Sequence, residues 1–347
     1  MRKIRILSLL LLTAALVAVV SCKKDKDSES TKPSLSGMTF TVAPYARGGE
    51  TLTVKPYGVV HPEGGTLKYY IKASDGVTVA KPDTVTVKGG LTKPGEVSFS
   101  FTVPDSLASY TITCSAIDDK SEYYSSGSSS YVTVVRPYTG GSITGAGIDP
   151  LEDRIVDPRT AGDSRERTYY YTAVEGLEWF RNNLAYTGSG AAYRDSDVLS
   201  YCFGRYYTYE EALHACPDGW RLPTDAEWAV FGRLATGQSA AKGETLSGAA
   251  GALMADVFFN EVKMWEYWPD VKITGQFGLA VLPAGYANKD GDFHAFVGIN
   301  QYAAFWTSDL SEDGTQALYR YFNVNSPDVF AGYADKNSFA ASVRCVR

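Results

Sequence analysis

Three large aromatic side chains crowd one short stretch of the chain. Trp265, Tyr267 and Trp268 fall within four positions, directly before Pro269. A regular helix or strand cannot turn all three rings inward, so we expect at least one of them to face solvent or a cleft. Aromatic faces with polar tips suit ligands that combine apolar faces with hydroxyls or amides. The alternative is that Trp265 and Trp268 belong to the core and Tyr267 is incidental.

The sequence lacks the usual patterns of metal sites and nucleophilic enzymes. None of its three histidines lies four residues from another, and no Cys-x-x-Cys occurs, so no zinc site is expected. Residues 288–292 resemble a calcium loop, but the glycine is misplaced and no closing Glu follows, which favours a hairpin turn. No Gly-x-Ser-x-Gly is present. We therefore expect no catalytic residue and no cofactor. His294, in a strand beside aromatic residues, remains a candidate ligand contact.

The first residues predict export and lipidation. Arg2, Lys3 and Arg5 precede an apolar run over residues 6–20, which is too short for a stable membrane span. The run ends at Val-Val-Ser-Cys, which resembles a bacterial lipobox with Cys22 as the lipidated residue. A short charged stretch follows and resembles the surface-export signal of Bacteroidetes lipoproteins. We expect a signal peptide over residues 1–21, a polar tether over residues 22–34, and a lipid anchor in the outer membrane that faces outward.

The composition excludes one class of partner. The net charge is −6, and removal of the signal peptide with its three basic residues makes it −9. Nothing forms a basic stripe, so no nucleic-acid partner is expected. Aromatic residues make up 13 % of the chain, including 24 tyrosines.

Residues 35–137 are predicted to form an all-β, immunoglobulin-like sandwich. Seven short alternating runs are separated by Gly-rich turns, at residues 39–42, 51–54, 67–72, 84–87, 97–103, 110–116 and 131–135. Cys114 lies on the inward phase of its run, so we expect a free buried thiol. Nothing here indicates chemistry, and the module is interpreted as a spacer.

The second half has a different texture. Residues 138–165 are rich in Gly, Ser and Thr and then in charge, which is typical of a linker. Residues 166–347 are predicted to be an α+β domain. Capping boxes at Thr208 and Thr224 predict helices over residues 209–215 and 225–235, the second ended by Gly237. A third helix is expected over residues 248–259. Short strands are expected after them, at residues 279–282, 293–297, 304–307, 317–323 and 342–346.

Six motifs in this half resemble a known family. They are W-F-R-N-N-L at 179–184, G-R-Y-Y-T at 204–208, C-P-D-G-W-R-L-P-T-D-A-E-W at 216–228, L-P-A-G-Y at 282–286, F-W-T-S at 305–308 and S-V-R-C-V-R at 342–347. Their order is similar to that of the Fibrobacter succinogenes major paralogous domain, over residues 175–347. The resemblance implies a fold similar to C-type lectin-like domains and says little about activity. The Trp-Asn-Asp and Glu-Pro-Asn signatures that bind calcium in true C-type lectins are absent.

The resemblance also implies a disulfide and a binding face. Cys216 and Cys345 lie in the two family motifs that carry cysteine, so we expect them to be bonded, with Cys202 as the competing partner. In lectin-like folds the region between the early helices and the last strands forms the variable face. There we place a ligand site of six residues: Trp265, Tyr267, Trp268, Tyr286, Asn288 and His294.

The resulting hypothesis is a non-catalytic surface lipoprotein that captures an extracellular nutrient. Glycans stack on Trp and Tyr, and cobamides such as vitamin B12 present a broad corrin face ringed by amides; the sequence does not separate these ligands. An outer-membrane transporter is a possible partner. The alternative is an adhesin or appendage subunit that binds another protein.

Overall fold

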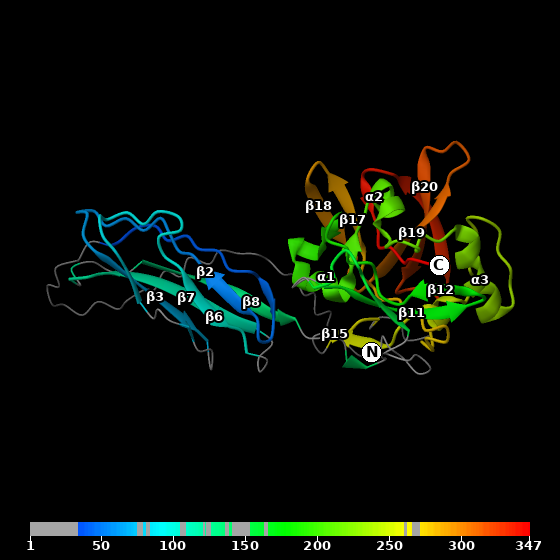
Figure 1. The fold of residues 1–347 in the computed structure, drawn as a ribbon, viewed down its shortest axis with the longest axis horizontal. Coiled ribbons are helices and arrows are strands. Elements are labelled where there is room, and N and C mark those ends of the chain that lie inside the picture. The colour runs from blue at the N-terminus through cyan, green and yellow to red at the C-terminus, as the bar shows by residue number, and fades with distance from the viewer. Residues whose placement is uncertain are drawn as a thin grey trace, which may run out of the picture.

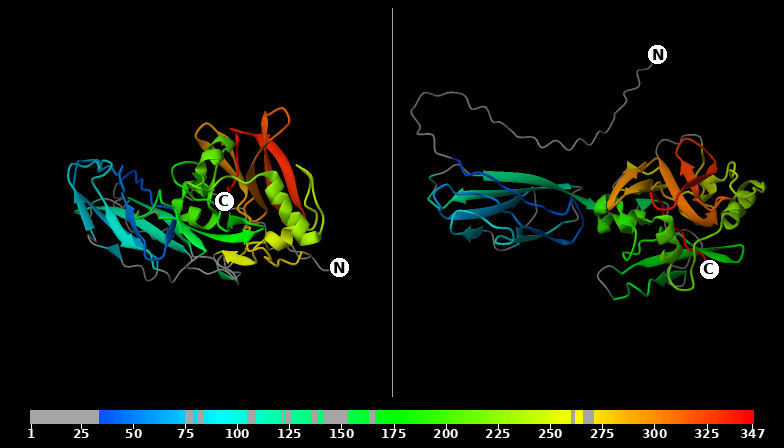
Figure 2. Two further views of the ribbon diagram at one scale, coloured as in Figure 1. Left: turned by 45° about the vertical axis from the view of Figure 1, so that its right-hand side comes forward. Right: turned by 90° about the horizontal axis from the view of Figure 1, so that it is seen from above.

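The structure is a computed structural model, and it describes residues 34–74, 79–80, 84–104, 109–120, 122, 126–135, 139–140, 153–162, 166–259, 262–265 and 271–347. A β-sandwich and a larger head lie end to end, which makes the molecule elongated (Figures 1 and 2). Strands make up 42 % of the described residues and helices 12 %. Cys22 and the predicted signal peptide and tether lie outside the described residues, except residue 34. Within the described part, no helix has the length and apolar character needed to cross a membrane.

The N-terminal module consists of two facing sheets, which confirms that it is all-β. One sheet has the order β1-β8-β7-β3-β5, and the other has the order β2-β6-β4. The strands are β1 (Tyr45–Arg47), β2 (Thr51–Val54), β3 (Leu67–Ala73), β4 (Val79–Ala80), β5 (Thr84–Val87), β6 (Phe99–Thr102), β7 (Ser109–Asp118) and β8 (Ser126–Val135). Alternate residues of β3 and β7 are buried, as expected for sheets with one wet face.

Two details of this module bear on the predictions. Cys114 is buried and free, as expected. The strand predicted over residues 39–42 is not formed, because only Thr39 pairs there, in an isolated bridge to Tyr57. The first edge strand is instead β1, which runs parallel to β8.

The predicted linker contributes strands to the head. Strand β9 (Thr139–Gly140) pairs with β15 (Val257–Phe259), and β10 (Arg154–Val156) pairs with β11 (Thr168–Val174). Backbone pairing with the head, which composition does not reveal, therefore begins before residue 166.

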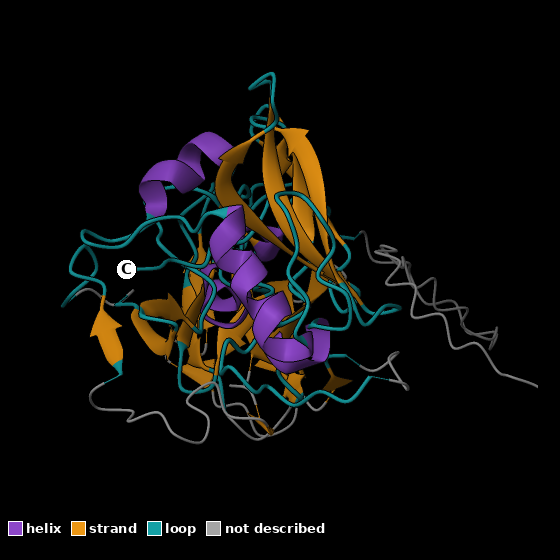
Figure 3. Ribbon diagram, turned by 90° about the vertical axis from the view of Figure 1, so that its right-hand side faces the viewer, coloured by secondary structure: helices purple, strands orange, loops and turns teal. Residues whose placement is uncertain are grey.

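The head combines short helices with small sheets. Helices α2 (Tyr209–Ala215) and α3 (Asp225–Thr236) begin at Thr208 and Thr224 with both halves of each capping box formed, as predicted. The helix expected over residues 248–259 is a single turn, α4 (Ala250–Leu253), because Val257–Phe259 are drawn into strand β15. The other helices are η1 (Tyr193–Asp195) and α1 (Asp197–Phe203), and the helices lie over the strands of the head (Figure 3).

Two three-stranded antiparallel sheets form the C-terminal part of the head. One has the order β18-β17-β22, with β17 (Tyr286–Asp290), β18 (Phe293–Val297) and β22 (Phe339–Ala340). The other has the order β19-β20-β21, with β19 (Tyr302–Leu310), β20 (Gln316–Asn323) and β21 (Val329–Asp335). Hairpin β17–β18 and strand β20 project to the same side of the head (Figure 1). The other strands are β12 (Leu177–Phe180), β13 (Ala191–Ala192), β14 (Arg205–Tyr206) and β16 (Val262–Lys263).

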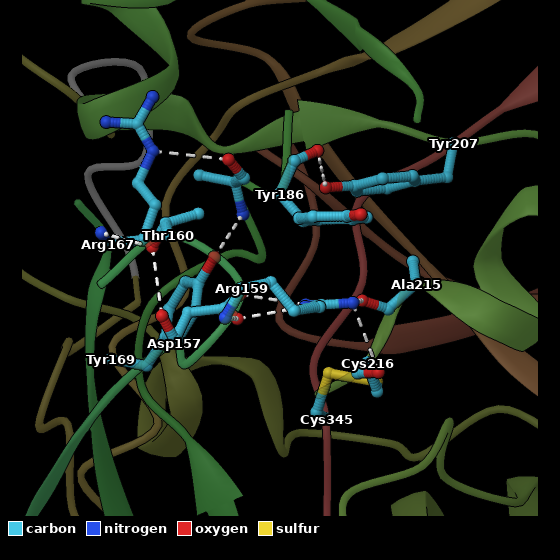
Figure 4. A network of polar contacts seen from close by, with 11 residues as sticks. Asp157, Arg159, Thr160, Arg167, Tyr169, Tyr186, Tyr207, Ala215, Cys216 and Cys345 are labelled. Atoms are coloured by element: carbon cyan, nitrogen blue, oxygen red, sulfur yellow. Dashed lines mark hydrogen bonds and ion pairs between the residues drawn. A yellow bond between two sulfur atoms is a disulfide. The ribbon is translucent and has the colours of Figure 1, made fainter. Parts of the chain in front are cut away.

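The end of the chain runs through the centre of the head instead of forming the predicted strands. Residues 279–282 and 342–346 contribute only isolated bridges, such as Trp179 to Val346. The Cys216–Cys345 disulfide is present, as the family resemblance implied, and the competing pairing with Cys202 does not form. The segment before the head is tied to this point: Arg159 forks onto Asp157 and donates to the Ala215 carbonyl at 2.9 Å (Figure 4).

Candidate functional site

Trp265, predicted from the sequence to lie in the ligand site, belongs to the core of the head. Trp265 is 2 % exposed, and its indole N–H donates to the carbonyl of Val281 at 3.2 Å. A ring buried on all sides with its polar atom bonded cannot offer a face to a ligand. Trp265 is therefore removed from the candidate site. Tyr267 and Trp268 lie outside the described residues.

The hairpin residues of the prediction divide between its two faces. Tyr286 and Asn288 lie two positions apart on β17 and therefore on one face. His294 is opposite Lys289 in the register, so it lies on the other face, where its ring stacks 6.2 Å from that of Phe296. Phe296 in turn contacts Tyr206. The structure thus groups Tyr286 with Asn288 and separates His294 from them.

Tyr286 and Asn288 line a hollow of about 400 Å³ at the meeting of the two sheets. The other lining residues are Tyr302 and Ala304 from β19, Tyr319 and Tyr321 from β20, and Phe339 from β22. Four tyrosines, one phenylalanine and one amide thus face a common space. The volume lies near the lower end of the ~300–1,000 Å³ typical of ligand pockets.

The rings of Tyr286, Tyr319 and Phe339 pack against one another and form the floor of the hollow, and the ring of Tyr302 stands beside this floor. Phe339 lies 4.8 Å from Tyr319 and 5.2 Å from Tyr286, at small interplanar angles of 34° and 32°. Tyr302 stands edge-on to Tyr286, at 73°. Trp306 lies beneath the floor, where it contacts both Tyr319 and Phe339 edge-on, and its indole N–H bonds to the Tyr207 carbonyl at 2.8 Å. The floor therefore rests on a fixed base.

Strand alternation on β20 explains why the rings of Tyr319 and Tyr321 face the hollow. On β20, Leu318, Arg320 and Phe322 are buried, and Tyr319 and Tyr321 between them point to the opposite face. Arg320 holds the strand from below through a fully buried ion pair with Asp225, whose two oxygens lie 2.5 and 2.7 Å from its nitrogens. The paired glycine on β21, Gly332, leaves room for the ring of Tyr319: a Cβ there would lie 2.7 Å from the hydroxyl-bearing end.

The polar groups of the hollow are neutral and open to bonding. Within the part of the chain that the structure describes, the hydroxyls of Tyr286, Tyr302, Tyr319 and Tyr321 form no hydrogen bond. Burial raises the pKa of the Tyr319 hydroxyl above its ordinary value, and the neighbouring Tyr321 and Tyr286 raise it further. Tyr319 is thus protonated at neutral pH and can both donate and accept.

The lining of the hollow combines aromatic faces with neutral hydrogen-bonding groups. The described residues include no cluster of three His, Cys, Asp or Glu side chains that could hold a metal. The lining itself holds no nucleophile with an adjacent base, since its polar groups are phenols and one amide. Flat apolar faces bordered by neutral donors and acceptors can orient and retain a ligand.

Comparison with models of protein families matches residues 165–347 to the Fibrobacter succinogenes major domain. The match covers more than half of the chain. The chain belongs to this family. Every lining residue of the hollow falls within the matched major domain. No curated protein matches the sequence.

Solved structures are similar to about a third of the chain. The PKD domain of an M14-like peptidase from the Thermoplasmatales archaeon SCGC AB-540-F20 is 22 % identical, with a TM-score of 0.23, and covers 30 % of this chain and 98 % of its own. The MSP family member WR4 of C. elegans is 11 % identical, with a TM-score of 0.20, and covers 27 % and 96 %. A conjugate transposon protein (27–141) from Bacteroides vulgatus is 17 % identical, with a TM-score of 0.19, and covers 32 % and 92 %.

Four aromatic lining residues of the major domain were not predicted: Tyr302, Tyr319, Tyr321 and Phe339. The signal for two of them is present in the sequence. Tyr319 and Tyr321 alternate with Leu318, Arg320 and Phe322 in a segment predicted as a strand, so the two tyrosines share one face of that strand. No sequence signal indicates that this face meets Tyr286, because the two strands belong to different sheets.

Proposed function

We propose that the chain is a non-catalytic binding protein that captures an extracellular ligand in the hollow of its major domain. The observation that carries the proposal is the lining: four tyrosine hydroxyls without partners among the described residues, set around a floor of stacked rings. Groups that are left unsatisfied at the rim of an aromatic hollow gain most from a ligand that brings both apolar faces and hydroxyls or amides. Glycans and cobamides both have this character.

The setting of the proposal comes from the sequence. A lipidated Cys22 would hold the mature chain at the outer membrane, facing outward, with the sandwich as a spacer and an outer-membrane transporter as the recipient of the ligand. Residues 1–33, which carry the lipobox, lie outside the described part of the chain. Metabolic labelling with palmitate tests the anchor: Cys22→Ala should abolish labelling and detergent partitioning. A labelled Cys22→Ala protein would contradict it.

A lectin-like origin of the head is part of the same proposal. The six motifs resemble those of a family expected to share the C-type lectin-like fold, and the hollow lies on strands that follow the early helices in sequence. Calcium is not required by this proposal, because the ligand is held by rings and neutral groups.

The test is a titration of the soluble mature chain without its lipid against a glycan panel and cyanocobalamin. Binding should fall at least tenfold in Tyr286→Ala and Tyr319→Ala, since a central anchor contributes about 2 kcal/mol or more. Tyr131→Ala is the matched control, because Tyr131 is 70 % exposed on the sandwich. Binding that survives both hollow substitutions would place the site elsewhere. An absence of binding to every ligand would favour the adhesin alternative.

A further inference from the structure

We infer that the hollow takes an uncharged oligosaccharide of about two or three sugar rings. This inference rests on the proposed function and narrows it to one ligand class. Charge, size and ring geometry each exclude part of the range that the sequence leaves open.

The lining of the hollow carries no charged side chain. Arg320, on the same strand as Tyr319 and Tyr321, points to the other face and is neutralised by Asp225. Lys289 follows Asn288 on β17, and the alternation of a strand turns it away from the hollow. An anionic or cationic ligand would lose hydration here without gaining a counter-charge, which is unfavourable. The ligand that fits is therefore neutral.

The size of the hollow separates the two neutral ligand classes. A space of about 400 Å³ holds two or three linked pyranose rings when it is open to solvent on one side. A corrinoid is several times larger than this space, and only its rim would enter. Its broad planar face would also need a flat platform, whereas Tyr302 stands upright beside the floor at 73° to Tyr286.

The ring arrangement matches the two kinds of surface that a sugar presents. The C–H face of a pyranose carries small positive charges, which favour the negative face of an aromatic ring. The Tyr319, Phe339 and Tyr286 rings pack against one another at tilts of 34° and 32°, and the aromatic surface that they leave open lines the hollow. Sugar hydroxyls both donate and accept, as do the phenol groups and the Asn288 amide around them.

The experiment compares neutral and charged probes of equal length on the mature chain. Cellotriose, maltotriose and xylotriose are the neutral probes, trigalacturonate is the anionic one, and cyanocobalamin represents the larger class. We expect at least one neutral trisaccharide to bind in the micromolar to millimolar range and the other two classes not to bind. Tyr319→Ala should weaken that binding about tenfold or more, and Tyr319→Phe, which keeps the ring, by about threefold to tenfold.

The outcomes distinguish this inference from the proposed function. If trigalacturonate or cyanocobalamin binds and Tyr319→Ala weakens it, the hollow is a ligand site but the inference is wrong. If a trisaccharide binds equally well to Tyr319→Ala, Tyr286→Ala and the Tyr131→Ala control, the site is elsewhere and both fail. Silence of every probe counts against both. Each variant is first checked by urea unfolding, and Tyr319→Phe provides the answer if Tyr319→Ala does not fold.

Discussion

The guanidinium group of Arg47, in the sandwich, lies over the ring of Tyr201, in the head, 3.3 Å from its centre. Arg167 of the head is stacked on the same ring at the same distance. Close by, Arg194 of the head donates a hydrogen bond of 2.7 Å to the hydroxyl of Tyr45 in the sandwich. Val135 of the sandwich also packs with Leu199 and Phe203 of the head in one apolar cluster.

This joint predicts that the sandwich and the head move as one body. Tyr201→Ala removes two cation–π contacts, and each such contact stabilises a protein by about 0.5–2 kcal/mol, with the larger values at desolvated sites. We expect the distribution of interdomain distances measured by small-angle X-ray scattering to broaden in this variant. Tyr131→Ala, which alters an exposed tyrosine of the sandwich, should leave it unchanged. An unaltered distribution in Tyr201→Ala would show that other contacts hold the joint.

Gly332 is expected to control ligand binding although it does not line the hollow. A methyl group at this position would meet the end of the Tyr319 ring, with a Cβ distance of 2.7 Å, and push it into the hollow. Gly332→Ala should therefore weaken trisaccharide binding several-fold. Its effect on the free energy of unfolding should be small, because the Tyr319 ring can move into the open space of the hollow. Gly314→Ser in the β19–β20 turn is no substitute control, since its φ of 68° strains any side chain. The control is Ala331→Gly on the same strand. Unchanged affinity in Gly332→Ala would contradict the positioning role.

The buried pair of Arg320 and Asp225 is expected to be essential for the fold beneath the hollow. Arg320→Ala would leave the Asp225 carboxylate buried without its counter-charge, and we expect the free energy of unfolding to fall by about 3–5 kcal/mol. Arg233→Ala breaks an exposed pair with Glu175 and should cost less than about 1 kcal/mol. Urea unfolding measures both. Equal costs would show that burial does not set the difference.

The sequence predicts local structure in the head far better than it predicts the hollow. Thr208 and Thr224 each begin a capping box. Because a capping box depends on only four consecutive residues, both helices begin where the sequence predicts. The position of Trp265 depends on whether its ring meets Val281 or solvent, which is a contact between distant segments. The hollow depends on two separate sheets placing Tyr286 beside Tyr302, and no periodicity encodes that meeting.

The Cys216–Cys345 disulfide is expected to contribute substantially to the stability of the head. It joins residues 129 positions apart, and the chain-entropy model gives about 4–5 kcal/mol for a loop of this length. Dithiothreitol should lower the urea midpoint of the head by a corresponding amount. The Cys216→Ser/Cys345→Ser double variant should start at the lower midpoint and show no response to the reductant. A response there would point to a different bond.

The pKa of Asp313, in the β19–β20 turn, is expected to lie below the ordinary value of an aspartate carboxyl group. Hydrogen bonds from the Ser311 hydroxyl at 2.6 Å, and then from the Thr315 backbone and hydroxyl, lower its pKa to about 2. Because the folded pKa lies below the ordinary value of about 3.9, the stabilisation is complete above that value and is lost as the pH falls through about 2. Carboxyl NMR titration measures this pKa, and Ser311→Ala should raise it. An unshifted Asp313 would contradict the geometry.

The closing segment of the head has a consequence for how the protein is made. Val343, Cys345 and Val346 are fully buried, and Val346 bridges both Trp179 and Arg221. Of the head's elements, this segment is synthesised last, yet the others assemble around it. The sandwich, in contrast, has its own core and is complete about two hundred residues earlier. We therefore expect the sandwich to fold before the head, because the segment at the centre of the head is synthesised after the head's other elements. While that segment is missing, the apolar core of the head is incomplete, and this is the stage of biogenesis at which we expect the protein to be most prone to aggregation.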